Sequence, residues 1–545
     1  MDIFHSIHGI TIPALLRRQA EHHRFKLAMS VPSHRGHRDR LSYAQLVHRM
    51  SAMAQGLHAC GLRHGQRVGL LLSNKAAREA VLTALGCWQL GIAVAPLNGK
   101  ASDEELRHAV ELIDPAMLVV ANTQDVQRLA SLGLGHIPTL RLDGSEGAPS
   151  TWPEPENRVA APVQLDCRIS PQDLSCLLFT SGTTARSKAV MHTHQSQLHA
   201  GLAIGGAMGL TANDTYQGAF PIFTSSAWNL ACMSAWVYGA GVVLEEDGLD
   251  NGARLRLIHA ECTSVYHGVP ALLHFLVDEF ARGGYDARCV RRLGYGGAPM
   301  PIEVMEKFAH HWPHVDQVHI WGMTETGPAG TALPSWMLPR LAGAVGFPQA
   351  GCSIRILAEA SEEKLTEQDT QTVLRDAPPG EVGEIAFAGL SAASGYFRNS
   401  DASAQTFVEG WVLSGDLGRI DREGVLHYVD RKKDVINRGG LKISSAAVED
   451  AIYRCPGVAE AAVVAIPHPK LGEDIAACIV AKHSTSFELE AVQAVCARLL
   501  AENEIPRHWT VLASLPKNAM GKVLKQELRM QLIESSAAKT IPSAL

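Results

Sequence analysis

The stretch RVGLLLSNKAAREAVLTALGCWQLGIAVAPL, residues 67–97, decides the fold class of this chain. It opens with a short apolar run, continues through a helix-length segment and closes with a second apolar run, which is the pattern of a βαβ unit. The helix-like SDEELRHAVELID (102–114) and the apolar AMLVVA (116–121) continue the alternation. Because strands that alternate with helices form a mainly parallel sheet, the sequence predicts a doubly wound α/β region.

The same alternation returns later in the chain. Four apolar runs precede a loop or a helix-like segment, namely LSCLLFT (174–180), GVVLEE (241–246), SVYHG (264–268) and VRRLGYGG (290–297). We therefore expect a second doubly wound α/β subdomain, followed by a β-rich subdomain from residue 383 to residue 429. Past Lys433 the pattern becomes a compact α+β mixture, so the expected domains are a large one over residues 1–432 and a small one over residues 433–545.

Length and composition exclude several classes of protein. The chain has 545 residues, of which 46% are hydrophobic and 19% charged, which fits large buried cores and excludes a disordered or fibrous protein. The net charge is −6 and no basic block occurs, which argues against a nucleic-acid partner. The 11 cysteines include no C-x-x-C pair, so reduced thiols are expected and not a disulfide framework or a zinc site.

No segment has the pattern of a membrane span or an export signal. The most apolar stretch, Val81 to Leu97, is interrupted by Gln89 and predicts a buried helix that runs into a strand. Asp2 and His5 stand where a signal peptide carries positive charge. Since residues 541–545 also differ from the peroxisomal S-K-L address, we expect a cytoplasmic location.

The segment TSGTTARSKA, residues 180–189, carries the strongest local sign of chemistry. Its backbone N–H groups can converge on phosphate oxygens, and Lys188 supplies a cation. A Walker-type loop is disfavoured, because Ser187 replaces its second glycine and Ala189 replaces the hydroxyl residue that would hold magnesium. The alternative is a plain Ser/Thr-rich turn. The candidate phosphate-binding residues are Thr180, Ser181, Gly182, Thr183, Thr184 and Lys188.

Two further motifs follow two later strands, GGAP at 296–299 and WGMTET at 321–326. We expect both to join the first loop at the carboxyl edge of one sheet, where doubly wound proteins bind ligands. Glu325 is a candidate magnesium ligand and Thr324 a candidate phosphate donor, and the alternative for each is a helix cap.

Two histidine-containing segments favour a structural interpretation. His192 and His194 form an H-x-H pair without a third ligand in view, which is more often structural than metal-binding. The run from His310 to Asp316 resembles the His-His…Asp signature of condensation domains, but Gln317 replaces its glycine. We expect a solvent-facing helix end there.

Five motifs in order together resemble the adenylate-forming superfamily of acyl-CoA synthetases, aryl-CoA ligases, adenylation domains and firefly luciferase. They are TSGTT with its following lysine, GGAP, WGMTE, GWVLSGDLGRIDREGVLHYVDRKKD and LPKNAMGK, and they span nearly the whole chain. The resemblance implies an ATP-dependent carboxylic acid–CoA ligase. Such an enzyme lets the carboxylate attack the α-phosphate of ATP, releases pyrophosphate, and then transfers the acyl group to a thiol with release of AMP.

The resemblance also implies roles by position. Lys522 is the expected catalytic lysine, near the acid's carboxylate, while Glu325 holds Mg²⁺. Asp416 is expected to bind the ribose hydroxyls, with a β-turn aspartate as the alternative, and Arg431 to bind ribose or phosphate. Lys433 matches the hinge about which the small, mobile domain rotates. The nucleotide-binding set is completed by Gly297, Ala298, Pro299, Trp321, Gly322 and Met323.

The thiol side and the acyl side follow from the same resemblance. Gly439 and Gly440 are expected to line the CoA pantetheine tunnel, or else to form a simple turn. Thr224 stands where many acyl-CoA synthetases carry a gating histidine, and no acidic residue for an α-amino group occurs over residues 223–236. The expected acyl pocket is therefore mostly apolar and favours an aliphatic, alicyclic or aryl acid, although an ordinary core has the same composition. Its candidate lining residues are Phe223, Thr224, Trp228 and Tyr295.

Several departures from the family pattern accompany these motifs. Ala185 and Ala189 replace glycines of the loop, Trp321 replaces a tyrosine against adenine, and Lys442 replaces an amide residue. ATP, Mg²⁺ and CoA are the expected co-substrates, and the assembly stays open between monomer and homodimer. Two alternatives also stay open, transfer of the acyl group to a carrier-protein phosphopantetheine and a non-catalytic relative that binds nucleotide or acyl ligand.

Overall fold

The computed structural model forms two compact units. The first comprises Met1–Gly182, Arg186–Ile354 and Phe387–Leu413, and the second consists mainly of Arg355–Ala386 and Ser414–Leu545. The domain boundary expected between residues 432 and 433 stays a prediction. The structure describes residues 7–144, 151–153, 168–180, 186–298, 300–338, 340–358, 374–482, 487–517 and 523–538.

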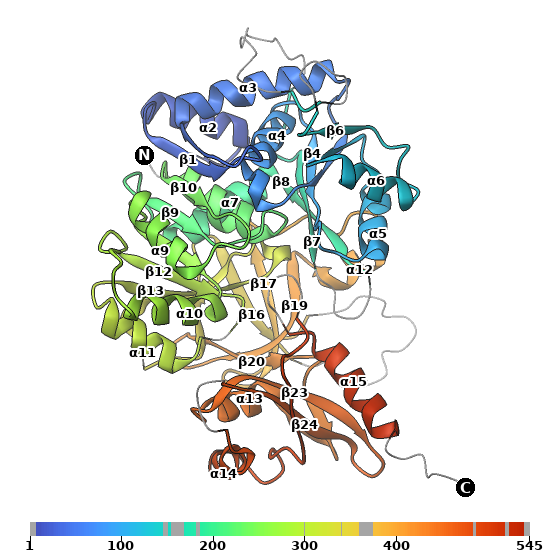
Figure 1. Ribbon diagram of the computed structural model, residues 1–545. Coiled ribbons are helices and arrows are strands. Elements are labelled where there is room, and N and C mark those ends of the chain that lie inside the picture. Colours follow the sequence, from blue (N-terminus) through green and yellow to red (C-terminus); the bar gives the residue numbers. More distant parts are fainter. Residues whose placement is uncertain are drawn as a thin grey trace. The chain divides into compact units, whose positions relative to one another are not determined.

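A six-stranded sheet forms part of the first unit (Figure 1). Its strands follow the order β6-β5-β3-β4-β7-β8, and all neighbours are parallel except β7 and β8. The strands are β3 (Arg67–Leu71), β4 (Ala93–Pro96), β5 (Met117–Val120), β6 (Thr139–Arg141), β7 (Leu174–Thr180) and β8 (Lys188–Thr193).

Helices cover both faces of this sheet, because its central strands are apolar on both sides. Val68 and Val94 pack into one core cluster, while Leu71 and Leu118 pack into another on the opposite face. The first face is covered by α3 (Tyr43–Ala59) and by α4 (Ala77–Gln89), which follows the short η1 (Asn74–Ala76), and the second by α5 (Asp103–Ile113) and α6 (Thr123–Ser131). Helices α5 and α6 lie along one side of the sheet in Figure 1.

The second sheet of the first unit follows the order β15-β14-β13-β12-β11-β9-β10-β1-β2. The strands from β13 to β1 are parallel, and β14, β15 and β2 are antiparallel to their neighbours. The strands are β1 (Leu27–Pro32), β2 (Arg38–Ser42), β9 (Thr215–Gly218), β10 (Gly241–Leu244), β11 (Val265–Gly268), β12 (Arg292–Gly296), β13 (Asp316–Gly322), β14 (Gly330–Leu333) and β15 (Ala344–Pro348).

Helices again cover both faces, so the sheet is doubly wound. On one face, Val265 and Val318 belong to the large core that contains α2 (Ile12–His22), α7 (His194–Ala207), the π-helix η3 (Ser226–Met233) and α8 (Ser234–Val237). On the other face, Leu293 and Tyr295 pack with helices α9, α10 and α11. These are α9 (Asn251–Ala260), α10 (Pro270–Ala281) and α11 (Ile302–His311).

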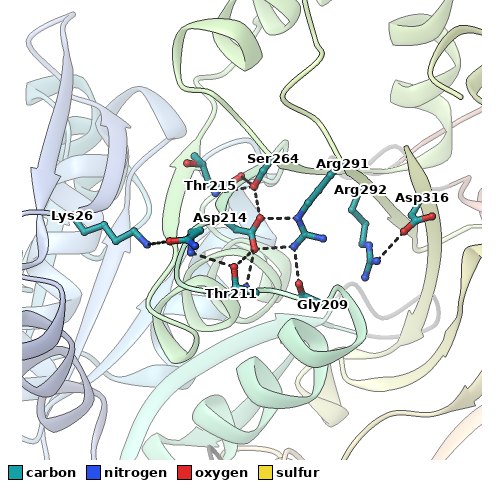
Figure 2. A network of polar contacts seen from close by, with 10 residues as sticks. Lys26, Gly209, Thr211, Asp214, Thr215, Ser264, Arg291, Arg292 and Asp316 are labelled. Carbon is teal, nitrogen blue, oxygen red and sulfur yellow. Dashed lines mark hydrogen bonds and ion pairs between the residues drawn. The ribbon is translucent and has the colours of Figure 1, made fainter. Parts of the chain in front are cut away.

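A charged network joins the amino ends of three strands of this sheet (Figure 2). Asp214, just before β9, accepts two hydrogen bonds of 2.8 Å from Arg291 and one of 2.7 Å from Ser264. Arg291 precedes β12 and Ser264 precedes β11, so the network fixes these strands relative to one another. Burial opposes ionisation of Asp214, but the hydrogen bonds from Arg291 and Ser264 outweigh it and lower the pKa of the carboxyl to about 2.

The second unit contains β-rich and α+β parts. Strands β17, β19 and β20 are neighbours in that order, next to β16. A five-stranded sheet of order β22-β21-β24-β23, with β25 parallel to β24, follows. The strands are β16 (Cys352–Leu357), β17 (Gly383–Gly389), β19 (Trp411–Ile420), β20 (Leu426–Arg431), β21 (Ile436–Arg438), β22 (Leu441–Ile443), β23 (Val458–His468), β24 (Gly472–Ala481) and β25 (His508–Val511); the helices are α13 (Ser445–Tyr453), α14 (Leu489–Leu499) and α15 (Lys525–Ala538).

The fold class predicted from the sequence is confirmed, with one correction of topology. The strand before the TSGTT loop, β7, belongs to the six-stranded sheet, whereas the strands before GGAP and WGMTE, β12 and β13, belong to the other sheet. The expectation of one common sheet edge is therefore wrong, because local periodicity identifies strands but not their partners. No helix in the described part of the chain is long and apolar enough to cross a membrane.

Candidate active site

The candidate phosphate loop connects two strands of a hairpin. Thr180, the last residue of β7, is the register partner of Lys188, the first residue of β8. A Walker-type loop joins a strand to a helix, so the antiparallel return supports the exclusion of that class. Thr180 and Lys188 are both half-buried and lie side by side at one end of the hairpin.

Glycines shape the carboxyl edge of β12 and β13. A Cβ atom at Gly296 would overlap the carbonyl oxygen of Ile320, so the two strands approach each other here as only glycine permits. Gly297 has a φ of +80° and lies exposed with Ala298 just after β12. Trp321 and Gly322 are the last two residues of β13 and Met323 follows them, and all three are half-buried.

Glu325 is buried in a 3₁₀ turn, η4 (Thr324–Thr326), directly after β13. Its side chain is only 7% exposed, and its Oε1 atom accepts a hydrogen bond of 2.7 Å from the phenol of Tyr396. The ammonium nitrogen of Lys188 lies 4.6 Å from the centre of the Tyr396 ring. The structure therefore brings both to one tyrosine, with the predicted cation over its ring and the predicted metal ligand at its phenol oxygen.

The segment around Tyr396 pairs with β8 through an isolated β-bridge between Tyr396 and Val190. Met191 N donates to Gly395 O at 2.9 Å and Phe397 N donates to Ala189 O at 2.8 Å. The neighbouring Ala393 N donates to the backbone oxygen of Glu325 at 2.8 Å. One short segment thus connects the phosphate-loop hairpin to the turn that carries Glu325.

A buried histidine makes a second connection between these elements. His192, on β8, donates from Nε2 to the backbone oxygen of Thr324 at 2.8 Å, and its Nδ1 lies 3.3 Å from Ser196 Oγ. Burial lowers the pKa of His192 to about 4, so the ring is neutral and one nitrogen keeps a hydrogen to donate. His194 is also fully buried, which agrees with a structural role for the pair.

The donor set around Glu325 fits a magnesium ion that arrives with nucleotide. Mg²⁺ is usually held by one or two carboxylates together with waters and substrate phosphates. Glu325 offers one carboxylate beside a cation-bearing loop end. Nowhere in the described ranges, Glu325 included, is a group of three or more His, Cys, Asp or Glu side chains placed to hold a metal ion.

The candidate acyl-pocket residues lie in two places within the first unit. Thr224 is 5% exposed, and its hydroxyl donates to Pro221 O at 2.7 Å, just before the π-helix η3. Trp228, on η3, is fully buried and donates to Ile222 O at 2.7 Å. Tyr295 is also buried and stacks on His319 with ring centres 5.0 Å apart. Phe223 is half-buried beside Thr224.

The candidate ribose-binding residues line one cleft in the second unit. Asp416 and Arg431 are register partners on β19 and β20, with Asp416 Oδ1 and Arg431 Nε 3.6 Å apart. The cleft has a volume of about 410 Å³ and is also lined by Lys433. Burial and the neighbouring Arg431 lower the pKa of Lys433. The cleft therefore places a carboxylate among three cationic side chains, since Lys432 lines it as well.

Gly439 and Gly440 form the two-residue turn between β21 and β22. Their φ angles are +61° and +88°, and Arg438 pairs with Leu441 across the turn. A two-residue hairpin with positive φ at both positions favours glycine there, which fully explains the pair as a turn. The expected role in a pantetheine tunnel stays a prediction.

Several predicted site residues lie outside the described residues. They are Ser181, Gly182, Thr183, Thr184, Pro299 and the expected catalytic Lys522, together with the departure at Ala185.

Sequence reasoning missed two residues, Tyr396 and His192, as parts of this site. The contact between Tyr396 and Lys188 joins residues more than 200 positions apart, and no local pattern marks it. The H-x-H pattern marks His192 only as a metal ligand or a structural histidine. Its position two residues before the capped start of α7 gives no sign of the Thr324 contact.

These features define a class of protein. A hairpin with a candidate phosphate loop, a buried glutamate after a sheet strand and an Asp–Arg cleft are the parts expected of an adenylate-forming enzyme. The family described as "AMP-binding enzyme" matches residues 16–397, and its C-terminal domain matches residues 447–522. The chain belongs to this family, and within it to the AMP-forming acid–CoA ligases.

Three similar proteins illustrate the relationship. A feruloyl-CoA synthase of Amycolatopsis sp is 30% identical over 493 residues, which cover 90% of this chain and 93% of the relative. A 3-[(3aS,4S,7aS)-7a-methyl-1,5-dioxo-octahydro-1H-inden-4-yl]propanoyl:CoA ligase of Rhodococcus jostii is 28% identical, covering 90% and 93%. The solved structure of o-succinylbenzoate coenzyme A synthetase from Bacillus subtilis, in complex with ATP and magnesium ion, is 26% identical with a TM-score of 0.79, covering 94% of this chain and 98% of that one.

Proposed function

We propose that the protein activates a hydrophobic, ring-bearing carboxylic acid with ATP and transfers the acyl group to CoA. The single observation that carries the proposal is the meeting of Lys188 and Glu325 at Tyr396 in a chain of this family. Carboxylate attack on the α-phosphate of ATP builds negative charge at phosphorus. A fixed ammonium group and a carboxylate-held metal stabilise that charge.

The proposed nucleotide contacts are assigned residue by residue. Thr180 and Lys188 bind phosphate oxygens at the end of the β7–β8 hairpin, and Glu325 holds Mg²⁺, which neutralises phosphate charge when bound. Asp416 accepts hydrogen bonds from the ribose hydroxyls, because a carboxylate beside cations in a cleft can serve a diol as acceptor. Arg431 is proposed to bind the ribose or a phosphate of the same nucleotide.

The nature of the acid is proposed from the acyl side and from the relatives. The hydroxyl hydrogen of Thr224 is already donated to Pro221 O, so this position offers no free donor to a polar acid. Trp228 is fully buried, and its indole N–H is already donated to Ile222 O. Relatives named for feruloyl and octahydro-indenyl-propanoyl substrates support an aryl or alicyclic body over a straight chain.

Pyrophosphate release across a panel of acids tests the proposal. Benzoic, cinnamic, alicyclic and straight-chain acids are each incubated with ATP and Mg²⁺, with and without CoA. We expect release with a ring-bearing acid and CoA-dependent formation of its thioester. If pyrophosphate is released but the acyl product forms only with a phosphopantetheine-loaded carrier protein, that carrier and not CoA is the acceptor. No pyrophosphate release with any acid would refute the proposed activity.

A further inference from the structure

Tyr396 is the point at which two groups of the proposed adenylation site meet. It is 6% exposed, and its phenol and its ring face contact different partners. The phenol oxygen donates to Glu325 Oε1 at 2.7 Å, and the ring lies under the Lys188 ammonium at 4.6 Å. All three residues belong to the same compact unit, so the arrangement does not depend on the second one.

We propose that Tyr396 is a positioning residue, which orients the Glu325 carboxylate toward Mg²⁺ and the Lys188 ammonium toward the phosphates of ATP. This inference rests on the proposed function, because it assigns Tyr396 a task in nucleotide binding. Tyr396 acts through Glu325 and Lys188, and no contact of its own with substrate is required.

The hydrogen bond to Glu325 restricts the carboxylate before any ligand binds. A hydrogen bond to an ionised acceptor is short and stronger than one between neutral groups. The phenol of Tyr396 supplies the hydrogen of this bond, and the Glu325 carboxylate accepts it. A side chain that is already ordered loses less conformational entropy when the metal arrives.

The ring face restricts the Lys188 ammonium in the same way. A lysine side chain has four rotatable bonds, and an aromatic face within about 6 Å of the ammonium attracts it by a cation–π interaction. Tyr396 also pairs with Val190 in a β-bridge, two residues beyond Lys188 on β8. Ring and ammonium are therefore fixed to adjacent backbone segments.

The backbone holds Tyr396 rigidly enough for this task. Hydrogen bonds from Met191 to Gly395 and from Phe397 to Ala189 flank it on both sides. The edge of the Phe407 ring packs against the Tyr396 ring with centres 5.5 Å apart. A positioning residue has to be supported by its own surroundings, and Tyr396 is supported by three neighbours.

The decisive variant is Tyr396→Phe, which keeps the ring under Lys188 and removes the hydrogen bond to Glu325. ATP binding is measured by calorimetry without any acid, at a series of Mg²⁺ concentrations. We expect the Mg²⁺ concentration for half-maximal binding to rise about fivefold to tenfold, which corresponds to the net contribution of about one typical hydrogen bond. The same Mg²⁺ dependence as in the wild type would overturn the proposal.

Tyr266→Phe is the matched control. It removes a buried hydrogen bond of 3.0 Å between Tyr266 and a different glutamate, Glu245, in the same unit. We expect its Mg²⁺ dependence to equal that of the wild type. An equal rise in both variants would show a general effect of destabilisation and would overturn the proposal.

Two further variants separate the two contacts. Tyr396→Leu also removes the ring, and we expect ATP affinity at saturating Mg²⁺ to fall a further two- to fivefold. In a Glu325→Gln background, Tyr396→Phe should change the Mg²⁺ dependence by less than twofold, because the two residues act together. An unchanged fivefold effect in that background would overturn the route through Glu325.

A substitute variant and the choice of readout separate a folding defect from an effect on Mg²⁺-dependent ATP binding. If Tyr396→Phe fails to fold, Phe407→Leu is the substitute variant, because it removes the aromatic contact that holds the Tyr396 ring. The Mg²⁺ concentration for half-maximal ATP binding should then rise about twofold. No rise would overturn the proposal. The binding measurement needs no acid. It therefore still reports on Tyr396 if the acid panel fails and the proposed ligase activity has to be abandoned.

Discussion

At the scale of single residues, Asp214 shows how a buried carboxylate contributes to stability. It is 5% exposed and bonded to Arg291 and Ser264 at the amino ends of three strands. Its pKa of about 2 in the folded protein lies below the ordinary value of 3.8. A carboxyl with a lowered folded pKa stabilises the fold above its ordinary pKa and loses that contribution as the pH falls toward the folded pKa.

Asp214→Asn should therefore lower stability near neutral pH by about 2 kcal/mol. The difference from the wild type should be constant above about pH 5 and should shrink as the pH falls from about 4 toward 2. Thermal-unfolding midpoints of both proteins over this range measure it. A difference that grows on acidification would contradict the assignment.

Lys522 is the residue on which the chemistry is expected to depend, although it lies outside the described residues. Lys522→Ala should lower acyl-adenylate formation on the order of 10²-fold, since it removes a fixed cation from the developing charge. Thioester formation from added acyl-adenylate should change much less. Pyrophosphate release and thioester formation are measured separately.

Lys517→Ala is the control for Lys522. Lys517 pairs with Glu460 at 2.6 Å in a partly exposed ion pair, which contributes little to stability. It should leave both half-reactions near the wild-type rate. Equal losses in both half-reactions for Lys522→Ala would assign that lysine another role.

At the scale of elements, glycines in α7 permit close packing against η3. A Cβ atom on Gly201 would lie 2.6 Å from backbone atoms of Met233, which cannot move without shifting the π-helix. The early part of α7 is buried all round, so no solvent-exposed side can absorb the displacement. Helices α7 and η3 can therefore pack this closely only because residue 201 is a glycine.

Gly201→Ala should destabilise the protein by about 1–3 kcal/mol, as overpacking of a core does. Gly206→Ala is the control, because its Cβ would meet only the phenol end of Tyr238 at 3.0 Å. Alanine favours a helix over glycine by about 1 kcal/mol, so this control should be neutral or slightly stabilising. Thermal-unfolding midpoints compare the two, and equal losses would contradict the packing argument.

The elements were largely predictable from the sequence, and their partners were not. The segment 67–121 shows its strands and helices through local periodicity, and the structure has them in place. The sheet to which β7 belongs depends on pairing with β4, about 80 residues earlier, and that information is absent from any local window. This is why the motifs were expected on one sheet but lie on two.

At the scale of the whole molecule, the site could be predicted where it is local. Asp416 and Arg431 line one cleft because they face each other across a single hairpin, whose tight DREG turn is visible in the sequence. Tyr396 lies far along the chain from Lys188, so only the folded chain shows their contact. Contacts within one hairpin can be predicted from a short stretch of sequence, whereas contacts between distant segments depend on how the whole chain packs.

The hinge expected at Lys433 gives a prediction for the complete catalytic cycle. Lys433→Pro fixes φ near −65° and should block rotation of the following segment. We expect adenylation within about twofold of the wild type and thioester formation lowered on the order of tenfold. Lys433→Ala, which removes the charge but leaves φ free, is the control. Equal rates of thioester formation in both variants would contradict the hinge.

Hydrogen bonds to Asp430 should make the rate of any such rotation strongly temperature-dependent. It is 2% exposed, and its carboxylate accepts hydrogen bonds from Ser445 N at 2.6 Å and Ser445 Oγ at 3.0 Å, at the start of α13. A rotation at Lys433 that separates Ser445 from Asp430 would break both hydrogen bonds to this carboxylate. Separating such a pair demands enthalpy. If this rotation limits turnover, the turnover rate should rise steeply with temperature. The activation enthalpy should be lower in Asp430→Asn and Asp430→Ala than in the wild type.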